Sequence, residues 1–316
     1  MNANKLPIGG GRNYGLDLLK ILACICVVLI HVNTPLTAYY FPILRFAVPE
    51  FFLISGYLFY KDNTELRVTR RKKYLKYYVS LTIISATLYL FVCLPHRDFS
   101  SLVTIFLFNE PSWAIHLWYL FAYCYVLLAI GIIEKLNLRK VVVYTIPLLL
   151  VVDLMMGSYA KLFFSISFPN YVTRNWLFEG LPYFVIGCMF KKRIPIISSF
   201  NLVFLLIIGI ALSYVEHFSL IQSGNYTERC NYMGTIIVTI SAFLLAHRLP
   251  VHNEHIRILS EGYIFPVYIL HPLVAFTILE NSYISLSPGF FYLRPIYVII
   301  VTLLITKIYK ISKQYG

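Results

Sequence analysis

Charged residues are scarce in this chain of 316 residues. Asp, Glu, Lys and Arg make up 13% of it, whereas hydrophobic residues make up 59%, and the mean hydropathy is +0.72. A soluble domain carries roughly 25% charged residues. A water-soluble fold of this length has too little polar surface to cover so many apolar side chains. The composition therefore excludes a soluble protein and predicts an integral membrane protein.

Acidic residues are especially few, with 14 against 27 Lys and Arg residues and a net charge of +13. A strongly basic chain is typical of nucleic-acid binding. Here the basic residues lie in short clusters between apolar runs. This pattern excludes nucleic acid as a partner and indicates loops that set membrane topology.

The sequence also lacks the patterns of a disulfide framework or a metal site. Five of its six cysteines lie within apolar stretches, where they are expected to pack as small hydrophobic residues. No His-x-x-x-His pair and no cysteine pair has the spacing of zinc ligands. We therefore expect no metal. The N-terminus is polar through Arg12 and lacks a cleavage site, so we expect no signal peptide.

Long apolar runs are what the chain does contain. A spanning helix needs ~20 mostly apolar residues, and backbone groups in lipid must be paired within a helix. We therefore predict an all-α, polytopic membrane protein with about ten transmembrane helices, forming a single domain over residues 1–316. The predicted helices cover residues 16–38, 43–60, 74–95, 116–133, 141–157, 176–190, 199–217, 230–247, 262–280 and 291–309.

The Lys and Arg residues predict the orientation of these helices. With a cytoplasmic N-terminus, twenty of them fall on the cytoplasmic side and six on the outer side, and Lys20 lies within the first helix. Basic residues concentrate on the cytoplasmic side of membrane proteins. The count therefore favours cytoplasmic placement of both termini.

Charges within a predicted span are candidates for function. Asp17 and Lys20 are three residues apart, so they share a helix face and are placed to pair. Lys20 and His31 are eleven residues apart, which is three turns plus ~20° and a rise of ~16 Å. We predict one polar stripe that runs from a charged pair near the cytoplasm to an imidazole in the outer half.

Two interpretations of this stripe are open. Asp17 and Lys20 are suited to anchoring the helix at the membrane interface, with the lysine reaching to headgroups. His31 is suited to a structural bond with a neighbouring carbonyl. The functional alternative is proton transfer, for which histidine is the best side chain near neutral pH.

Further polar residues fall on the same predicted outer side as His31. Glu50 begins the second helix, either as a solvated carboxylate favoured by the helix dipole or as an acceptor for the second N–H of His31. His116 begins the fourth helix, either in an aromatic belt or as a residue that orients His31 or the substrate. His271 precedes Pro272, which frees a backbone carbonyl that this imidazole is suited to bind.

The densest charge run, residues 67–73, lies in a predicted cytoplasmic loop. One interpretation is topology setting together with binding of anionic lipid headgroups. The other is a clamp for the phosphates of a soluble, nucleotide-bearing cosubstrate. The candidate clamp residues are Arg67, Arg70, Arg71 and Lys73.

Several motifs together resemble acyltransferase family 3 of bacterial membrane proteins. A basic residue, ten intervening residues and a histidine are a hallmark of that family, and Lys20 and His31 fit it. Arg67 and Arg70 match its Arg-x-x-Arg element, and Arg70 and Lys73 match it in a shifted register. The other stretches that resemble the family are 15–20, 48–57, 116–120, 174–184 and 268–271.

The resemblance implies transfer of an acyl group, usually acetyl, from acyl-coenzyme A to a hydroxyl of a cell-envelope glycan or lipid-linked sugar. It implies a multi-pass protein of the bacterial cytoplasmic membrane, surrounded by lipid and without a tightly bound cofactor. His31 is then the general base or a transient acyl carrier, with Asp17, Lys20, Glu50 and His116 around it. Arg67, Arg70, Arg71 and Lys73 then bind the acyl-coenzyme A.

A function of another class is also open. Some relatives with this membrane fold are fused to amino-acid racemases, which suggests a transporter or a recognition module for an amino acid or sugar. The sequence indicates no oligomeric state. Thioester turnover distinguishes an acyltransferase from such a transporter.

Overall fold

The computed structural model describes residues 12–92, 104, 105, 109, 111–227, 231–279 and 289–315. The regular secondary structure of these residues is helical throughout, without a β-strand. The predicted all-α fold class is therefore confirmed. The chain forms two compact units: unit 1 comprises Met1–Ala47, Ile197–Ala211 and Gly234–Gly316, and unit 2 comprises Val48–Ile196 and Leu212–Met233. One boundary between the units falls within α11 (Ser199–Gln222).

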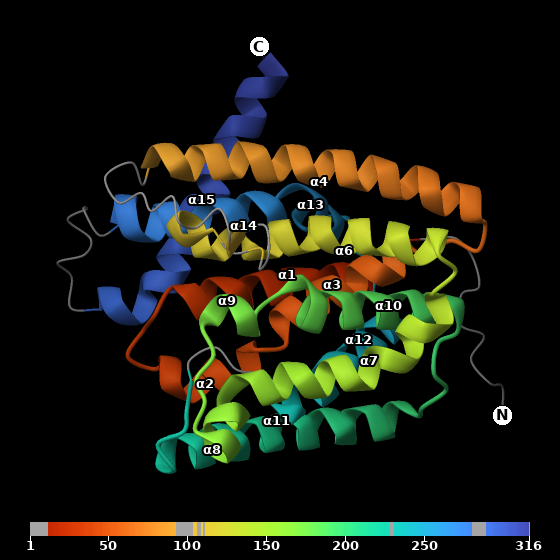
Figure 1. The fold of residues 1–316 in the computed structure, drawn as a ribbon. Coiled ribbons are helices and arrows are strands. Elements are labelled where there is room, and N and C mark those ends of the chain that lie inside the picture. Colours follow the sequence, from red (N-terminus) through yellow and green to blue (C-terminus); the bar gives the residue numbers. More distant parts are fainter. Residues whose placement is uncertain are drawn as a thin grey trace. The chain divides into compact units, whose positions relative to one another are not determined.

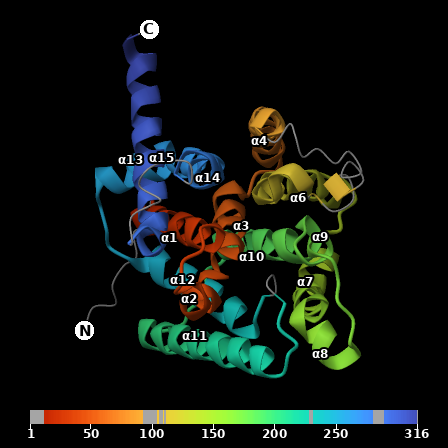
Figure 2. The same cartoon turned by 90° about the vertical axis from the view of Figure 1, so that its left-hand side faces the viewer.

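Unit 1 is organised around its first helix. Besides part of α11, its helices are α1 (Tyr14–His31), α2 (Thr37–Leu44), α12 (Met233–Arg248), α13 (Glu254–Gly262), α14 (Ile264–Leu273), the π-helix η5 (Val274–Leu279) and α15 (Phe290–Tyr315). α1 packs against α2, α13, α14 and α15, and Figure 2 shows it next to α14 and α15. The side chain of Asn13 caps α1 by accepting a hydrogen bond from the N–H of Leu16 at 2.9 Å.

Unit 2 holds most of the remaining helices. They are α3 (Ala47–Phe59), α4 (Thr64–Val92), the 3-10 helix η2 (Ser112–Leu117), α6 (Trp118–Lys135), α7 (Arg139–Leu154), η3 (Met155–Tyr159), α8 (Ala160–Phe164), α9 (Asn170–Thr173), η4 (Trp176–Gly180) and α10 (Leu181–Lys192). α4 and α6 run side by side (Figure 1), and η4 packs against α6, α7 and α10.

Seven helices of the described residues are long and apolar enough to cross a membrane. They are Tyr14–His31, Thr37–Phe59, Thr64–Val92, Ala114–Lys135, Arg139–Phe164, Ser199–Gln222 and Phe290–Lys313. They confirm the predicted helices that begin at residues 16, 43, 74, 116, 141, 199 and 291. The chain is therefore a multi-pass membrane protein.

The other three predicted spans differ from the structure in an informative way. The span predicted over 262–280 falls on a pair of helices, Glu254–Gly262 and Ile264–Thr277, that meet at a bend of 50°. The spans predicted over 176–190 and 230–247 fall on α10 and α12, which have 12 and 16 residues. A helix of this length rises at most ~24 Å, less than the ~30 Å hydrocarbon core. The count of ten is therefore not confirmed.

Two glycines bring α3 and α10 of unit 2 into backbone contact. A Cβ atom on Gly56 would lie 1.9 Å from the carbonyl oxygen of Phe184, and one on Gly187 would lie 2.0 Å from the carbonyl oxygen of Leu53. The thiol of Cys188 also donates to the Gly56 carbonyl at 3.4 Å. Small residues allow this close approach between helices in membranes. The contact fixes the position of Glu50 at the start of α3 relative to α10.

We expect Gly187→Ala to destabilise the protein, because the added methyl group overlaps backbone that cannot turn away. Forcing extra volume into packed helices costs ~1–3 kcal/mol. Thermal unfolding in detergent measures the effect. Gly289→Ala is the matched control, since nothing lies within 4 Å of a Cβ atom at that position. Equal stability of the two variants would contradict the proposed role of the backbone contact.

Candidate active site

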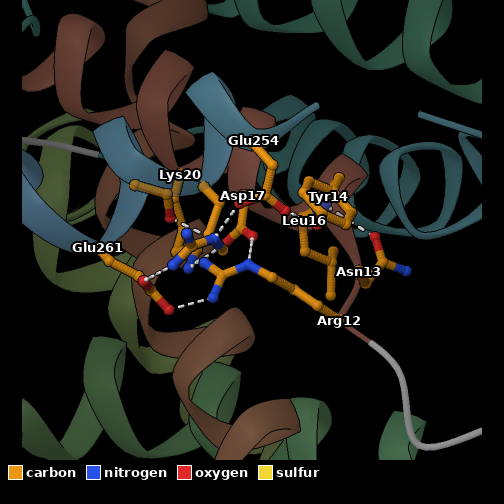
Figure 3. A network of polar contacts seen from close by, with 10 residues as sticks. Arg12, Asn13, Tyr14, Leu16, Asp17, Lys20, Glu254 and Glu261 are labelled. Atoms are coloured by element: carbon orange, nitrogen blue, oxygen red, sulfur yellow. Dashed lines mark hydrogen bonds and ion pairs between the residues drawn. The ribbon is translucent and has the colours of Figure 1, made fainter. Parts of the chain in front are cut away.

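Charged residues at the start of α1 form a network around the buried carboxylate of Asp17 (Figure 3). The carboxylate of Asp17 accepts hydrogen bonds from Lys20 Nζ at 2.6 Å, from Ser260 Oγ at 2.8 Å and from the Arg12 side chain. The predicted pairing of Asp17 with Lys20 is therefore confirmed. Asp17 is 3% exposed, so its charge is balanced within the protein. The contact with Ser260 ties α1 to α13.

More ion pairs extend this network along α13. Arg12 also pairs with Glu261, and Arg257 pairs with Glu254 at 2.5 Å and with Glu261 at 3.1 Å. The Tyr14 hydroxyl donates to Glu254 at 2.5 Å. The basic groups Arg12, Lys20 and Arg257 thus meet the acidic groups Asp17, Glu254 and Glu261. Because the charges are balanced, the network favours a role in holding α1 to α13 over a role in binding a phosphate.

His31 is the last residue of α1 and is partly exposed. The helix is continuous from Tyr14, so the ~16 Å rise from Lys20 to His31 holds. The imidazole of His31 stacks on that of His271, with ring centroids 5.3 Å apart and an angle of 14° between the ring planes. His271 is fully buried in α14, and its Nδ1 lies 3.1 Å from the carbonyl oxygen of Val267.

This histidine pair was not predicted from the sequence. His271 was expected to bind the carbonyl that Pro272 frees, which is that of Tyr268, and the structure gives its Nδ1 a bond to the carbonyl of Val267. The two histidines are 240 residues apart in the chain, and no local pattern relates them. Only the packing of α1 against α14 brings them together.

Glu50 lies at the start of α3 in unit 2 and is fully buried. The interpretation of Glu50 as a solvated carboxylate is therefore wrong. Neither of its carboxylate oxygens has a hydrogen-bond partner among the residues that the structure describes, and the same is true of the Tyr183 hydroxyl. Tyr183 lies within electrostatic range of Glu50, Asp153 and Glu179. Asp153 in turn accepts a hydrogen bond from Asn231 Nδ2 at 2.8 Å.

His116 lies in η2 of unit 2 and is buried, with 8% exposure. Its ring meets the ring of Tyr89 edge-on, with centroids 4.4 Å apart. His31 belongs to unit 1, whereas Glu50 and His116 belong to unit 2. The predicted contacts of Glu50 and His116 with His31 therefore stay predictions.

Arg67 is the most constrained residue of the basic run. Its guanidinium donates to Glu134 Oε1 at 2.9 Å, to the Asp62 carbonyl at 2.7 Å, to Thr64 Oγ1 at 2.8 Å and to the Lys61 carbonyl. Four of its five N–H groups are thus used within the protein. Arg67 is 2% exposed and joins the turn between α3 and α4 to α6. This arrangement favours a structural role for Arg67.

The other predicted clamp residues are more accessible. Arg70 donates to the carbonyl oxygens of Leu58 at 2.5 Å and Phe59 at 3.4 Å. Arg71 is partly exposed and lies against Gly131 of α6, and Lys73 is exposed. Binding of a phosphate by these three residues stays a prediction.

A cavity of about 200 Å³ lies next to the Arg67–Glu134 pair. Its apolar lining includes Phe59, Ile130, Ile133, Val142, Val185 and Met189, and its polar lining consists of Tyr60, Arg67, Glu134, Arg139 and Lys192. Arg139 and Lys192 are exposed, and Arg139 forms an ion pair with Glu134 at 3.1 Å. The cavity therefore combines an apolar wall with two accessible cations, as an anionic amphiphile requires.

Cations crowd together at this end of unit 2. Lys191 lies beyond the predicted span 176–190, and its ammonium is 4.7 Å from the centre of the Tyr57 ring. Burial and the nearby charges of Lys61 and Arg70 lower the pKa of Lys191. Such mutual repulsion of cations favours the binding of an anion here. In the described part of the chain, no group of three His, Cys, Asp or Glu side chains is placed to hold a metal ion.

Comparison with known proteins identifies the chain at the level of its family. The model of an acyltransferase domain matches residues 13–308, which is nearly the whole chain. No curated protein and no solved structure matches it. The match includes α1 with Lys20 and His31 and the basic run with Arg67 and Arg70. The chain therefore belongs to acyltransferase family 3.

Proposed function

We propose that this acyltransferase moves an acyl group, in the simplest case acetyl, from acyl-coenzyme A to a hydroxyl of a cell-envelope polysaccharide or lipid-linked sugar. The observation that carries the proposal is His31, an ionisable side chain at the end of a membrane-spanning helix in a member of an acyltransferase family. Ionisable residues within spans mark functional sites by default. The continuous α1 that joins His31 to Lys20 supports the assignment.

In the proposed reaction, His31 acts as the general base. Its unprotonated ring nitrogen takes the proton of the acceptor hydroxyl while the hydroxyl oxygen attacks the thioester carbonyl. The carbon–sulfur bond then breaks, and the leaving thiolate takes the proton back from the imidazolium. The products are the ester and coenzyme A, and the histidine returns to its first state. In a variant, His31 carries the acyl group before the acceptor takes it.

The cavity beside Glu134 is our candidate for part of the donor site. Arg139 and Lys192 supply charge for the phosphates of acyl-coenzyme A, and the apolar wall suits its long arm. Arg70, Arg71 and Lys73 are further candidates on the basic run of α4. Arg67 then supports the cavity wall, since its own donors are already engaged.

We expect the double variant Arg139→Gln/Lys192→Gln to raise the KM for acyl-coenzyme A about tenfold with little change in kcat. Each exposed cation–phosphate contact contributes ~0.5–1 kcal/mol, and 1.4 kcal/mol corresponds to a tenfold change. Steady-state kinetics with purified protein measures both constants. Lys135→Gln/Lys140→Gln is the matched control, because these lysines are exposed in the same region but do not line the cavity. An unchanged KM in the first variant would remove the cavity from the donor site.

One experiment tests the proposed function as a whole. Purified protein is incubated with acyl-labelled acetyl-coenzyme A and an envelope glycan fraction, and thioester loss and label on the glycan are followed. The proposal expects both. Uptake of an amino acid or sugar into proteoliposomes without thioester turnover would instead establish the transporter alternative. Mass spectrometry of envelope glycans from a deletion strain, complemented with wild type or His31→Ala, then identifies the acyl group and the acceptor.

A further inference from the structure

The stacked histidines of unit 1 extend the proposed chemistry to a second residue. The rings of His31 and His271 lie nearly parallel, at 14°, with centroids 5.3 Å apart. His31 is partly exposed, whereas His271 is completely buried. One ring is therefore accessible, and the other forms its support.

The support is rigid because of how α14 holds His271. The Nδ1 nitrogen of His271 donates its proton to the carbonyl oxygen of Val267, one turn earlier, at 3.1 Å. α14 begins next to the 50° bend and continues after Pro272 into the π-helix η5. Bent and π-helical segments within membrane helices often lie at functional sites. The backbone bond and the full burial together fix the plane of the His271 ring.

The chemistry of the pair follows from this bond. A neutral imidazole that donates from Nδ1 has no proton on Nε2. Its ring face then attracts a cation stacked on it, as aromatic faces do. Two imidazolium rings at 5.3 Å would repel each other. The stack therefore favours a state in which His31 carries a proton and His271 does not, which is the state that a general base reaches during its reaction.

We propose that His271 is a positioning residue for His31. Its ring fixes the orientation of the His31 imidazole and stabilises the imidazolium that forms when His31 takes the acceptor proton. This role rests on the proposed function. No proton moves to or from His271, and no bond to it forms or breaks.

Other charged groups belong to the elements that pack around this pair. Arg45 follows α2 and lies over the ring of Phe41, and Arg294 of α15 lies over the ring of Phe276 and donates to the Ala275 carbonyl. Both are cations, so neither provides a counter-ion for an imidazolium. Asp17 and Lys20 lie more than ~15 Å away along α1. Within unit 1, the stacked ring of His271 is therefore a stabilising group for the imidazolium of His31.

The test separates the stacked ring from the nitrogen atoms. His271→Ala removes the ring, and His271→Phe keeps a flat ring while removing both nitrogens. We expect His271→Ala to lower kcat roughly 10- to 100-fold, with the KM for acyl-coenzyme A within about twofold of wild type. We expect His271→Phe to recover most of the loss. His255→Ala is the control, because His255 is exposed on α13. The pH profile of kcat should change for His271→Ala and stay unchanged for the control.

A second measurement does not depend on activity. NMR of protein with labelled imidazole rings reports the ring-current shift that a stacked neighbour imposes on the ring protons of His31. The His31 signal is assigned as the one that is missing from the spectrum of His31→Asn. The shift should disappear in His271→Ala and persist in His271→Phe and His255→Ala. If the wild-type protein transfers the acyl group and His271→Ala has the same kcat, the positioning role of His271 is wrong while the proposed function stands. Absence of thioester turnover in the wild type overturns the proposed function and with it this role.

Discussion

We expect replacement of His31 with Asn to lower the kcat of acyl transfer by about 10³-fold, within the range that a general base contributes to catalysis. Asparagine keeps a polar side chain of similar size but cannot accept a proton near neutral pH. His31 is the last residue of α1 and partly exposed, so its removal opens no internal cavity. Transfer of label from acetyl-coenzyme A to the glycan measures the loss, and thermal unfolding shows that the variant is folded.

The two versions of the mechanism differ in a further result. If His31 carries the acyl group, wild-type protein incubated with labelled acetyl-coenzyme A without acceptor takes up label, and His31→Asn does not. If His31 is only a base, neither protein is labelled. His255→Asn serves as the control for general effects of losing an exposed histidine. Full activity of His31→Asn would eliminate both versions of the mechanism. The chain would still belong to its family, but His31 of α1 would not be its catalytic base.

The spans that the sequence predicted correctly are those whose apolar helical segments reach 18 or more residues. The segments predicted over 176–190 and 230–247 form shorter helices in the structure, of 12 and 16 residues. In the first of them, the π-helix η4 precedes α10 and packs against α6 and α7. Hydropathy measures preference for lipid, and it does not distinguish a short helix covered by protein from one that spans the membrane.

The site was predictable where contacts are local in sequence. Asp17 and Lys20 are one turn apart, so helical periodicity predicted their ion pair. Ser260 and Glu261, which complete that network, come from α13 and are more than 240 residues away. The same holds for His271, whose partner His31 lies at the other end of the chain. Such long-range partners follow from tertiary packing, and one sequence carries no signal for them.

Arg67 shows how a charge cluster in a sequence combines residues of different roles. As one member of a basic run, it was predicted to bind phosphate together with Arg70, Arg71 and Lys73. The structure gives Arg67 four bonds within the protein and leaves Lys73 exposed. Net charge alone is therefore a poor guide to which arginine is available to a ligand. Burial decides it, since a buried guanidinium must be paired.

Arg67→Ala is expected to destabilise the protein strongly, by ~3–5 kcal/mol, the usual cost of breaking a buried ion pair. The change leaves Glu134 paired with Arg139, and it frees the carbonyls of the turn between α3 and α4. At a few degrees per kcal/mol, the midpoint of thermal unfolding in detergent should fall by roughly 10 °C. Arg67→Lys should recover only part of this loss, because an ammonium cannot reproduce the guanidinium fork.

Lys72→Ala is the matched control for this prediction, because Lys72 is exposed on the same helix and should leave the unfolding temperature unchanged. The kinetic constants distinguish the two roles of Arg67. If Arg67 only supports the cavity wall, Arg67→Ala and Arg67→Lys lose stability, and the KM for acyl-coenzyme A does not change selectively. Unchanged stability with a raised KM for acyl-coenzyme A would contradict the structural role and show that Arg67 contacts the donor, as its Arg-x-x-Arg spacing with Arg70 implies.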